Sequence, residues 1–365
     1  MAINRVEIKD FLVFKGEFAA DFCPGVNVLI GENGTGKTTL LKCFYGATDT
    51  IGYTTSRYFD APGFVDSKDD VYISRVTYDV PYEQYNIQRK EISRSENYSN
   101  IAVFMSTSEE WERINDEFFA KINEIASHSE DGKKLNDEYR ANPLSFNVNK
   151  KSVMIPSAEM LSHSRGMLAM YYERKMPFDQ TQIDILVKAQ FPETREIKPN
   201  AKRILGKINE IIGGEVFYEN DMFYTLKKNG ERVYFTLEAS GYQRFGLLWK
   251  LLRNGLLEKG TTLLWDEPEN SLNPELIPEL VDILLELSRN GVQIFIATHS
   301  EILASYFAVN RQKGDSVMFY SLYRDGEQIK ANASERFDIL EPNNLTAEPV
   351  KLYEKEIEKG LGGNG

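Results

Sequence analysis

The sequence has 365 residues, 42% of them hydrophobic and 27% charged, and its 43 basic and 55 acidic side chains give a net charge of −12. This composition is typical of a soluble protein with one large domain or two modest ones, and the acidic balance excludes indiscriminate coating of nucleic acid, although a local basic surface stays possible. The two cysteines, Cys23 and Cys43, are too few for a disulfide framework. No apolar run reaches the ~20 residues that span a bilayer, and the N-terminus lacks a signal-peptide core, so we expect a cytoplasmic protein without a membrane partner.

The N-terminal segment has strand patterns that lead into a glycine-rich loop. Residues 5–9 alternate between polar and apolar side chains, which predicts a strand, and residues 11–22 predict a hairpin with its turn near Lys15 and Gly16. Residues 26–30 form an apolar run that predicts a buried strand, and residues 39–44 have the pattern of a helix.

The loop between this strand and this helix, Gly31 to Thr38, reads G-E-N-G-T-G-K-T and matches the P-loop pattern G-x-x-x-x-G-K-[ST] at every fixed position. Its glycines allow successive backbone N–H groups to surround phosphate oxygens, and the following helix directs its positive dipole end at the same group. We expect Lys37 to reach the β- and γ-phosphates of ATP and the Thr38 hydroxyl to ligate Mg²⁺. The residues expected to hold the nucleotide are Gly31, Asn33, Gly34, Gly36, Lys37, Thr38 and Thr39.

The middle of the chain mixes strand and helix patterns without an internal repeat. Thr107 to Glu110 is a capping box that predicts a helix through about Ala126, and no heptad is sustained through residues 108–150, so we expect no long coiled coil. Predicted strands cover 71–78, 85–93, 151–155, 216–219, 223–227 and 233–237, and predicted helices cover 178–190 and 201–212.

Residues 194–203, together with Lys207, form a locally basic stretch. Two interpretations are open: a contact with a phosphate backbone, or the solvated face of a helix. The second is the commoner explanation for such a stretch.

From Ala239 onward the pattern changes to helices that alternate with short apolar strands, which predicts α/β structure. The glycine-rich tail from Lys359 to Gly365 is predicted to fray. Predicted helices cover 242–254, 274–289 and 300–308, and predicted strands cover 261–265, 292–297, 317–323 and 328–331.

The strand at 261–265 ends in two carboxylates, Asp266 and Glu267, which is the Walker B arrangement. We expect Asp266 to hold the Mg²⁺ shell and Glu267 to orient or deprotonate the attacking water. The alternative is a simple acidic turn after a core strand, and the P-loop in the same chain makes that alternative less favoured.

Two further segments are candidates for contact with the γ-phosphate. His299 is one of only three histidines, and it follows the apolar strand at 292–297 at a strand end, a position that favours a functional over a structural role. Ser240 and Gly241 precede a helix and offer a hydroxyl and a helix N-terminus. Taken alone, an ordinary N-cap is the simpler interpretation of that pair.

Together these segments resemble the ABC-type P-loop ATPases, in which a P-loop, a Ser-Gly signature, a Walker B strand and a switch histidine follow in this order. Residues 266–274, D-E-P-E-N-S-L-N-P, are similar to the SMC/Rad50/RecF/OLD-like branch, also called AAA15, and less similar to transporters. Residues 5–39 also resemble the opening of RecF-like proteins. The resemblance covers residues 1–46 and 237–305 well.

The resemblance implies a homodimer in which two heads associate head to tail around two ATP molecules. Ser240 and Gly241 of one head would contact the γ-phosphate on the P-loop of the other, and residues 271–273 would form the D-loop at the dimer interface. The signature departs from the usual Leu-Ser-Gly-Gly-Gln at Ala239 and Tyr242, and Asn273 stands where the D-loop commonly has Asp.

The Q-loop residue is not identifiable from the sequence. Gln84 and Gln88 are candidates, and so is the loop after Pro156, which contains Glu159.

The predicted fold class is α/β: an ABC-type head with a mixed central sheet, an antiparallel flank and an inserted, mainly helical lobe. The predicted domains are an N-terminal part of the head at 1–84, the inserted lobe at 85–236, and a C-terminal part of the head at 237–365. With ATP and Mg²⁺ as ligands, the expected catalytic residues are Lys37, Glu267 and His299, and the expected metal ligands are Thr38 and Asp266.

Three hypotheses describe what ATP hydrolysis would drive. The first is a sensor or switch in a prokaryotic antiviral defence or toxin-like system that acts on a separately encoded effector protein, which the compact insert favours. The second is a RecF/Rad50-like ATPase of DNA repair or chromosome maintenance, with DNA as its partner. The third is a transporter motor, which the Asn-Ser-Leu-Asn-Pro segment disfavours.

Overall fold

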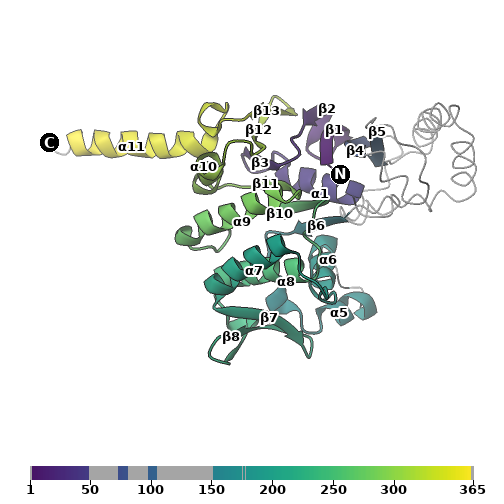
Figure 1. Ribbon diagram of the computed structural model, residues 1–365. Helices are drawn as coiled ribbons and strands as arrows, with labels where there is room; N and C mark the ends of the chain where they lie inside the picture. Colours follow the sequence, from purple (N-terminus) through teal and green to yellow (C-terminus); the bar gives the residue numbers. More distant parts are fainter. Residues whose placement is uncertain are drawn as a thin grey trace, which may run out of the picture.

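The computed structural model of the chain describes residues 2–48, 73–80, 98–104, 151–174, 176 and 178–362. The described strands form a six-stranded, a four-stranded and a three-stranded sheet (Figure 1). In spatial order, the six-stranded central sheet contains β13 (Gln328–Ser334), β12 (Val317–Asp325), β3 (Val26–Gly31), β11 (Gln293–Ala297), β10 (Thr261–Asp266) and β6 (Lys151–Ile155).

The central sheet is parallel except at one edge. The five strands from β12 to β6 are paired in parallel, and β13 pairs antiparallel with β12. A parallel sheet is covered on both faces, so its strands read as continuous apolar runs, and β10 and β11 are buried at every residue. The predicted mixed central sheet is therefore confirmed.

The antiparallel flank is the four-stranded sheet, with the order β2-β1-β4-β5. It confirms the predicted flank and the strand predicted at 71–78, which is β4. The strand predicted at 85–93 and the helix predicted from Thr107 lie outside the described residues. The strands are β1 (Ala2–Phe11), β2 (Phe14–Asp21), β4 (Ile73–Val80) and β5 (Tyr98–Phe104).

The turn of the first hairpin was predicted wrongly. It lies at Leu12 and Val13, whereas Lys15 and Gly16 belong to β2. Leu12 has a φ of 51°, a left-handed conformation for which Gly and Asn are the usual residues. Leucine is not a residue type that predicts such a turn, so the sequence pattern placed the turn at the nearest glycine instead.

Helix α1 (Lys37–Thr48) packs between the antiparallel flank and the central sheet. Residues alternate across the sheet, so that Leu264 and Phe295 face α1 while Leu263 and Ile294 face the helices on the other side. Phe22 joins the layers, because its ring lies 5.1 Å from that of Phe44 and 5.2 Å from that of Phe295 between centroids. The P-loop helix is thus fixed on both sides by apolar contacts.

The second face of the central sheet is covered by helices α8 (Ser240–Arg253), α9 (Ile277–Arg289) and α10 (Glu301–Asn310). These helices agree with the predicted ones within a few residues, except that residues 274–276 form a short 3-10 helix before α9. Helix α6 (Gln180–Ala189) contacts both β6 and α8, and α7 (Pro199–Ile212) packs on α8. The three-stranded sheet of β7 (Gly214–Glu219), β8 (Met222–Lys227) and β9 (Arg232–Tyr234) lies on the side of α8 away from the central sheet (Figure 1).

The range 85–236, predicted as one inserted lobe, contributes a strand to the central sheet, since β6 pairs along β10. Within this range, the strand predicted at 233–237 ends at Tyr234, and residues 235–237 form a 3-10 helix. Helix α5 (Met167–Arg174) was not predicted at all. The boundaries of an inserted lobe stay a prediction.

Helix α11 (Asn344–Gly362) projects from the rest of the described chain (Figure 1). It includes residues 359–362, which were predicted to fray. Among the described residues, no helix combines the length and the apolar character that a membrane crossing requires.

Two helical glycines allow a matched test of this packing. A Cβ atom on Gly246 of α8 would lie 2.6 Å from Cζ of Phe235, whereas a Cβ atom on Gly206 of α7 would meet nothing within 4 Å. We expect Gly246→Ala to lower the free energy of unfolding by about 1–3 kcal/mol through overpacking. Gly206→Ala should raise it by about 0.5–1 kcal/mol through helix propensity. Denaturant titration measures the free energy of unfolding of both variants. An equal change in the two variants would contradict the close packing of α8 against Phe235.

Candidate functional site

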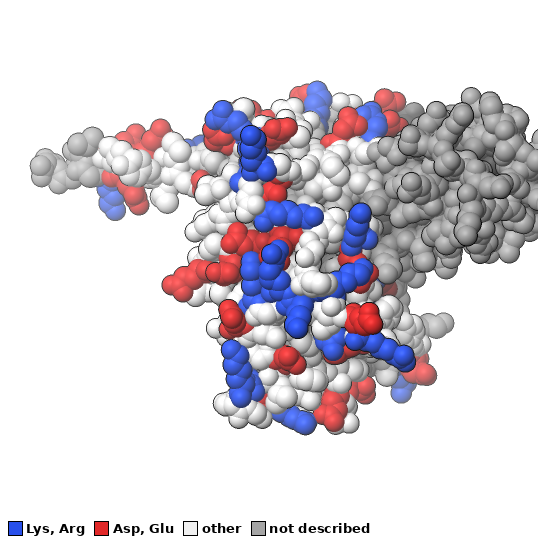
Figure 2. All heavy atoms as spheres, in the orientation of Figure 1, with Lys and Arg blue, Asp and Glu red and all other residues white. Residues whose placement is uncertain are grey.

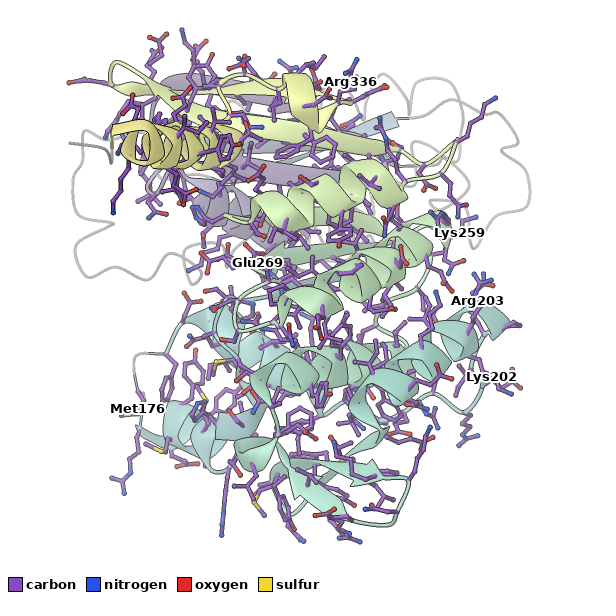
Figure 3. The ribbon with its side chains drawn as sticks, turned by 90° about the vertical axis from the view of Figure 1, so that its left-hand side faces the viewer. Met176, Lys202, Arg203, Lys259, Glu269 and Arg336 are labelled. Atoms are coloured by element: carbon purple, nitrogen blue, oxygen red, sulfur yellow. The ribbon has the colours of Figure 1, made fainter. Side chains whose placement is uncertain are left out.

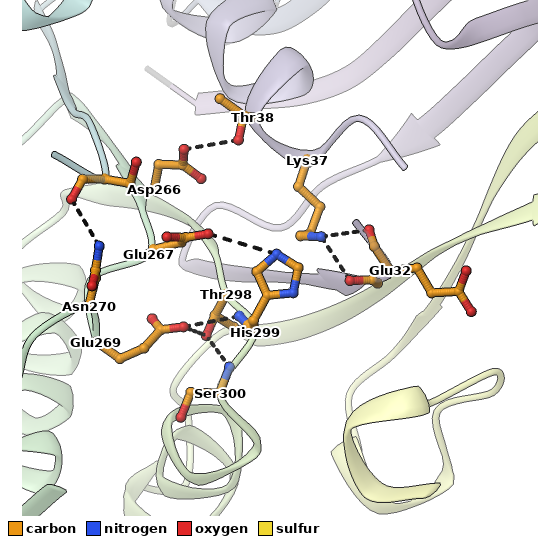
Figure 4. A network of polar contacts seen from close by, with 12 residues as sticks. Glu32, Lys37, Thr38, Asp266, Glu267, Glu269, Asn270, Thr298, His299 and Ser300 are labelled. Atoms are coloured by element: carbon orange, nitrogen blue, oxygen red, sulfur yellow. Dashed lines mark hydrogen bonds and ion pairs between the residues drawn. The ribbon is translucent and has the colours of Figure 1, made fainter. Parts of the chain in front are cut away.

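The register of the parallel strands brings three sequence segments to one edge of the central sheet. Ala297 of β11 pairs with Leu29 of β3 on one side and with Asp266 of β10 on the other. The P-loop, the carboxylates after β10 and the His299 segment therefore leave the sheet side by side (Figure 4). The carboxyl edge of a parallel sheet is the usual place for a ligand in α/β folds.

The backbone of the P-loop depends on glycine. Gly34 and Gly36 have φ angles of 77° and 89°, which favour a residue without a Cβ atom. A Cβ atom on Gly36 would also lie 2.7 Å from side-chain atoms of both Val13 and Phe14. The turn of the first hairpin thus packs against the loop and fixes its shape.

Lys37 is the buried cation of the site, with 6% of its surface exposed. Its Nζ donates hydrogen bonds of 2.8 and 3.0 Å to the carbonyl oxygens of Gly31 and Glu32. Burial lowers the pKa of Lys37 to about 8, and the charges of Asp266 and Glu267 act in the opposite direction. An ammonium group desolvated in this way fits an anionic ligand such as a phosphate.

Thr38 and Asp266 form the second polar contact of the site. Thr38 Oγ1 donates a hydrogen bond of 2.9 Å to Asp266 Oδ2. Burial raises the pKa of Asp266 to about 6, although the hydrogen bond from Thr38 opposes this shift. A hydroxyl oxygen beside a carboxylate oxygen is a donor set that Mg²⁺ accepts, so these two residues fit the metal predicted for them.

Glu267 and His299 face each other across the site (Figure 4). The distance from His299 Nε2 to Glu267 Oε1 is 3.8 Å, and each side chain is about one-third exposed, at 36% and 38%. Burial, followed by the charge of Lys37, lowers the pKa of His299, which favours the neutral imidazole. Glu267 has a left-handed φ of 49°, so its carboxylate stands at a sharp turn directly after β10.

Glu269 is a residue of the site that sequence reasoning missed. Its Oε1 accepts hydrogen bonds from Thr298 Oγ1 at 2.6 Å and from the backbone N–H of His299 at 3.0 Å. The third carboxylate in D-E-P-E was visible in the sequence, but nothing in the pattern indicated a partner 30 residues away. Glu269 connects the turn after β10 with the segment after β11.

Arg244 was also missed. It lies on α8 with 4% of its surface exposed, and its guanidinium donates to the carbonyl oxygen of Ser157 in the loop after β6. Burial lowers its pKa, and the charges of Glu159 and Glu269 oppose that shift. Asn270 also donates to Ser157 O, at 3.5 Å.

The loop after Pro156, one of the Q-loop candidates, leaves β6 at the same sheet edge. Glu159 in this loop accepts hydrogen bonds from the backbone N–H groups of Leu161 at 2.6 Å and Ser162 at 3.1 Å. The other candidates, Gln84 and Gln88, lie outside the described residues.

The signature pair lies at the start of α8. Ser240 is exposed, and a Cβ atom on Gly241 would lie 3.1 Å from Cδ1 of Leu272, so the pair adjoins the predicted D-loop. Within the described part of the chain, no hydrogen bond joins Ser240 to residues 31–38. The other predicted nucleotide contacts lie in the P-loop segment: Asn33 is exposed, and Gly31 and Thr39 are partly buried.

Residues 26–305 match the protein family described as "AAA domain, putative AbiEii toxin, Type IV TA system". The glutamine transport ATP-binding protein GlnQ of Bacillus subtilis (strain 168) is 35% identical over 48 residues, which is 13% of this chain and 20% of that protein. GlnQ of Geobacillus stearothermophilus is 31% identical over 68 residues, 19% of this chain and 26% of that protein. The matches thus span about a quarter or less of these relatives.

The fold is similar to that of a solved structure described as the SmcHead bound to the C-winged helix domain of ScpA. The TM-score is 0.50 at 12% sequence identity, and the match covers 92% of this chain and 98% of the other. At this identity the comparison shows the fold alone.

Two lysines of α1 test the P-loop geometry. Lys37→Ala is expected to weaken ATP binding by ~10-fold or more, because a buried charge-assisted contact with phosphate is lost. Lys42→Ala is the matched control, since Lys42 forms an ion pair with Asp179 instead and should leave binding close to that of the wild type. Titration with a fluorescent ATP analogue measures both, and unchanged affinity in Lys37→Ala would show that the P-loop assignment is wrong.

Proposed function

The chain belongs to this AAA-domain family of P-loop ATPases, and from that premise we propose that it hydrolyses ATP as a nucleotide-gated, head-to-tail dimer that acts as a switch on a separate protein. The observation that carries the proposal is the meeting of Lys37, the Thr38–Asp266 pair and the Glu267–His299 pair at one sheet edge. A buried cation, a metal-binding pair and a base beside an imidazole are the parts that phosphoryl transfer to water requires.

Each residue has a role that follows from its position. Lys37 holds the β- and γ-phosphates, and Thr38 and Asp266 hold Mg²⁺, which when bound supplies positive charge against the charge that develops on the phosphates. Glu267, at the sharp turn after β10, orients or deprotonates water. Burial lowers the pKa of His299, which favours the neutral imidazole, and a neutral imidazole offers one N–H donor and one acceptor nitrogen beside Glu267.

The dimer is supported by the position of the signature pair. Ser240 is exposed at the N-terminus of a 14-residue helix, and it makes no hydrogen bond to the P-loop of its own chain among the described residues. Ser271 of the predicted D-loop is exposed too, with a left-handed φ of 61°. Two neighbouring exposed segments with polar side chains suit a surface that meets the P-loop of a second head.

Glu267→Gln is expected to bind ATP normally and to hydrolyse it ~10²-fold more slowly, because a general base is lost. The uncleaved nucleotide should then hold two heads together. Light scattering with ATP and Mg²⁺ is expected to show a dimer of Glu267→Gln, and only a monomer would contradict the gated dimer.

The matched control adds Ser240→Arg to Glu267→Gln. The bulky side chain at the exposed end of α8 should return the protein to a monomer, and this monomer should still bind ATP through its own P-loop. A double variant that still dimerises with ATP would place Ser240 outside the interface.

A protein partner is supported more strongly than DNA by the charges of the surface. Part of the positive charge of the basic stretch at 194–207 is paired within the chain, because Lys198 pairs with Glu258 at 3.0 Å and Arg203 and Lys207 both pair with Glu286. Figure 2 shows basic side chains gathered in the middle of this face, with acidic side chains at their border. The paired side chains would have to give up these carboxylates to bind a phosphate backbone, which favours a protein partner over DNA.

The position of this basic stretch also separates it from the candidate site. Lys202, Arg203 and Lys259 lie along one side of the molecule, and Glu269 lies toward the other (Figure 3). Lys259 precedes β10, whereas Asp266 ends it, so the two regions are at opposite ends of that strand. DNA bound at the basic side chains would therefore not touch the nucleotide directly.

The family description names an AbiEii toxin of a type IV toxin–antitoxin system, and the similar SMC head was solved with a protein domain of ScpA bound. The first supports a role for this chain as a switch in a defence or toxin-like system, and the second supports a protein as its partner. In the native host, the ATP-trapped Glu267→Gln variant is expected to co-purify with one stoichiometric protein, and Lys37→Ala should lose it. Hydrolysis strongly stimulated by duplex DNA, with no such protein, would favour the DNA-repair alternative.

A further inference from the structure

The turn after β10 and the segment after β11 are joined by one carboxylate (Figure 4). Glu269 Oε1 accepts from the hydroxyl of Thr298 at 2.6 Å and from the backbone N–H of His299 at 3.0 Å. Thr298 is fully buried, so its hydroxyl has no access to water as an alternative partner. Hydrogen bonds to a carboxylate are among the stronger ones in proteins.

The same contacts fix the main chain on both sides of His299. The Thr298 backbone N–H donates to the carbonyl oxygen of Leu29 at 3.0 Å, and the Thr298 hydroxyl accepts from the backbone N–H of Ser300 at 2.9 Å. Ser300 in turn caps α10 by accepting from the N–H of Leu303 at 3.1 Å. His299 is therefore the centre of a three-residue segment whose orientation is set by Glu269, by β3 and by α10.

Glu267 and Glu269 belong to the same turn, so the contact of Glu269 with the His299 backbone also sets the distance between the imidazole and Glu267. The turn itself is tight: Asn270 N donates to Glu267 O at 3.0 Å, and Leu272 N donates to Glu269 O at 2.9 Å. A shift of the His299 segment would thus change the 3.8 Å separation between His299 Nε2 and Glu267 Oε1.

We propose that Glu269 is a positioning residue that holds the His299 imidazole opposite Glu267 through its two hydrogen bonds; for hydrolysis this rests on the function proposed above. Glu269 acts as a hydrogen-bond acceptor in this role, since Oε1 receives both bonds. The amide oxygen of a glutamine can accept the same two bonds. Its negative charge also raises the pKa values of Lys37, Asp266 and Arg244, and the experiment must separate that charge from the hydrogen bonds.

Steady-state kinetics with three variants separate these roles. Glu269→Ala is expected to lower kcat by ~10- to 10²-fold with little change in ATP affinity, since a small displacement of a catalytic group has effects of this size. Glu269→Gln, which keeps the acceptor and removes the charge, should rescue most of the lost kcat. Thr298→Val, close to isosteric, removes one of the two donors and should give an intermediate loss.

Double variants test whether Glu269 acts through His299. In a His299→Ala background, Glu269→Ala should cause no further loss, because residues that act together are not additive. Fully additive losses, or a Glu269→Gln variant as slow as Glu269→Ala, would overturn the proposal and indicate a direct electrostatic role.

A spectroscopic measurement tests positioning without hydrolysis. The chain has three histidines, so the ring signals of His299 can be assigned by NMR of ¹³C-histidine-labelled protein. The substitution Glu267→Gln should shift the His299 signals when it is made in the wild-type sequence or in the Glu269→Gln variant. It should not shift them when it is made in the Glu269→Ala variant. A response that persists in Glu269→Ala would overturn the proposal. If the signals behave as expected but no variant, including the wild type, hydrolyses ATP, positioning stands and the proposed hydrolysis fails.

Discussion

The parallel pairing of β3, β11 and β10 is the constraint on which the candidate site depends. In this register Leu29, Ala297 and Asp266 lie side by side, so the three segments that follow them meet at one edge. A slip of one residue would reverse which face of the sheet each side chain covers. It would bury Leu264 and Phe295 against the wrong layer and move Asp266 away from Thr38. The apolar packing of α1 and the polar contacts of the site therefore require the same register.

The parts that could be predicted from sequence are those with local signals. The P-loop has its glycines and lysine in eight consecutive residues. The strands β10 and β11 contain apolar runs, and polar residues stand at the end of β10 and directly after β11. Their convergence follows from a general property, since parallel strands end at a common edge. Thr38 and Asp266 are 228 positions apart in the sequence, and yet Thr38 Oγ1 lies 2.9 Å from Asp266 Oδ2. The P-loop and Walker B motifs together predict this proximity. The order of the strands in the sheet needed the structure.

The parts that could not be predicted depend on contacts between distant residues or on unusual backbone conformations. Leu12 forms a turn with a φ that sequence rules assign to Gly or Asn. Arg244 and Glu269 have partners on other elements, Ser157 and His299, that no spacing rule connects. Side chains of these types are usually solvated, so the sequence favours exposure for them until the packing of α8 and the turn after β10 is known.

Burial perturbs the two charged groups at the centre of the candidate site, Lys37 and Asp266. Burial lowers the pKa of Lys37 to about 8 and raises that of Asp266 to about 6, so each group has lost hydration that nearby charges only partly replace. Such perturbed groups cluster at functional sites because a ligand of the opposite charge restores what burial removed. A phosphate beside Lys37 and a metal ion beside Asp266 would do this for both. The desolvation that costs stability in the folded chain would thereby contribute to the affinity for a metal–phosphate ligand.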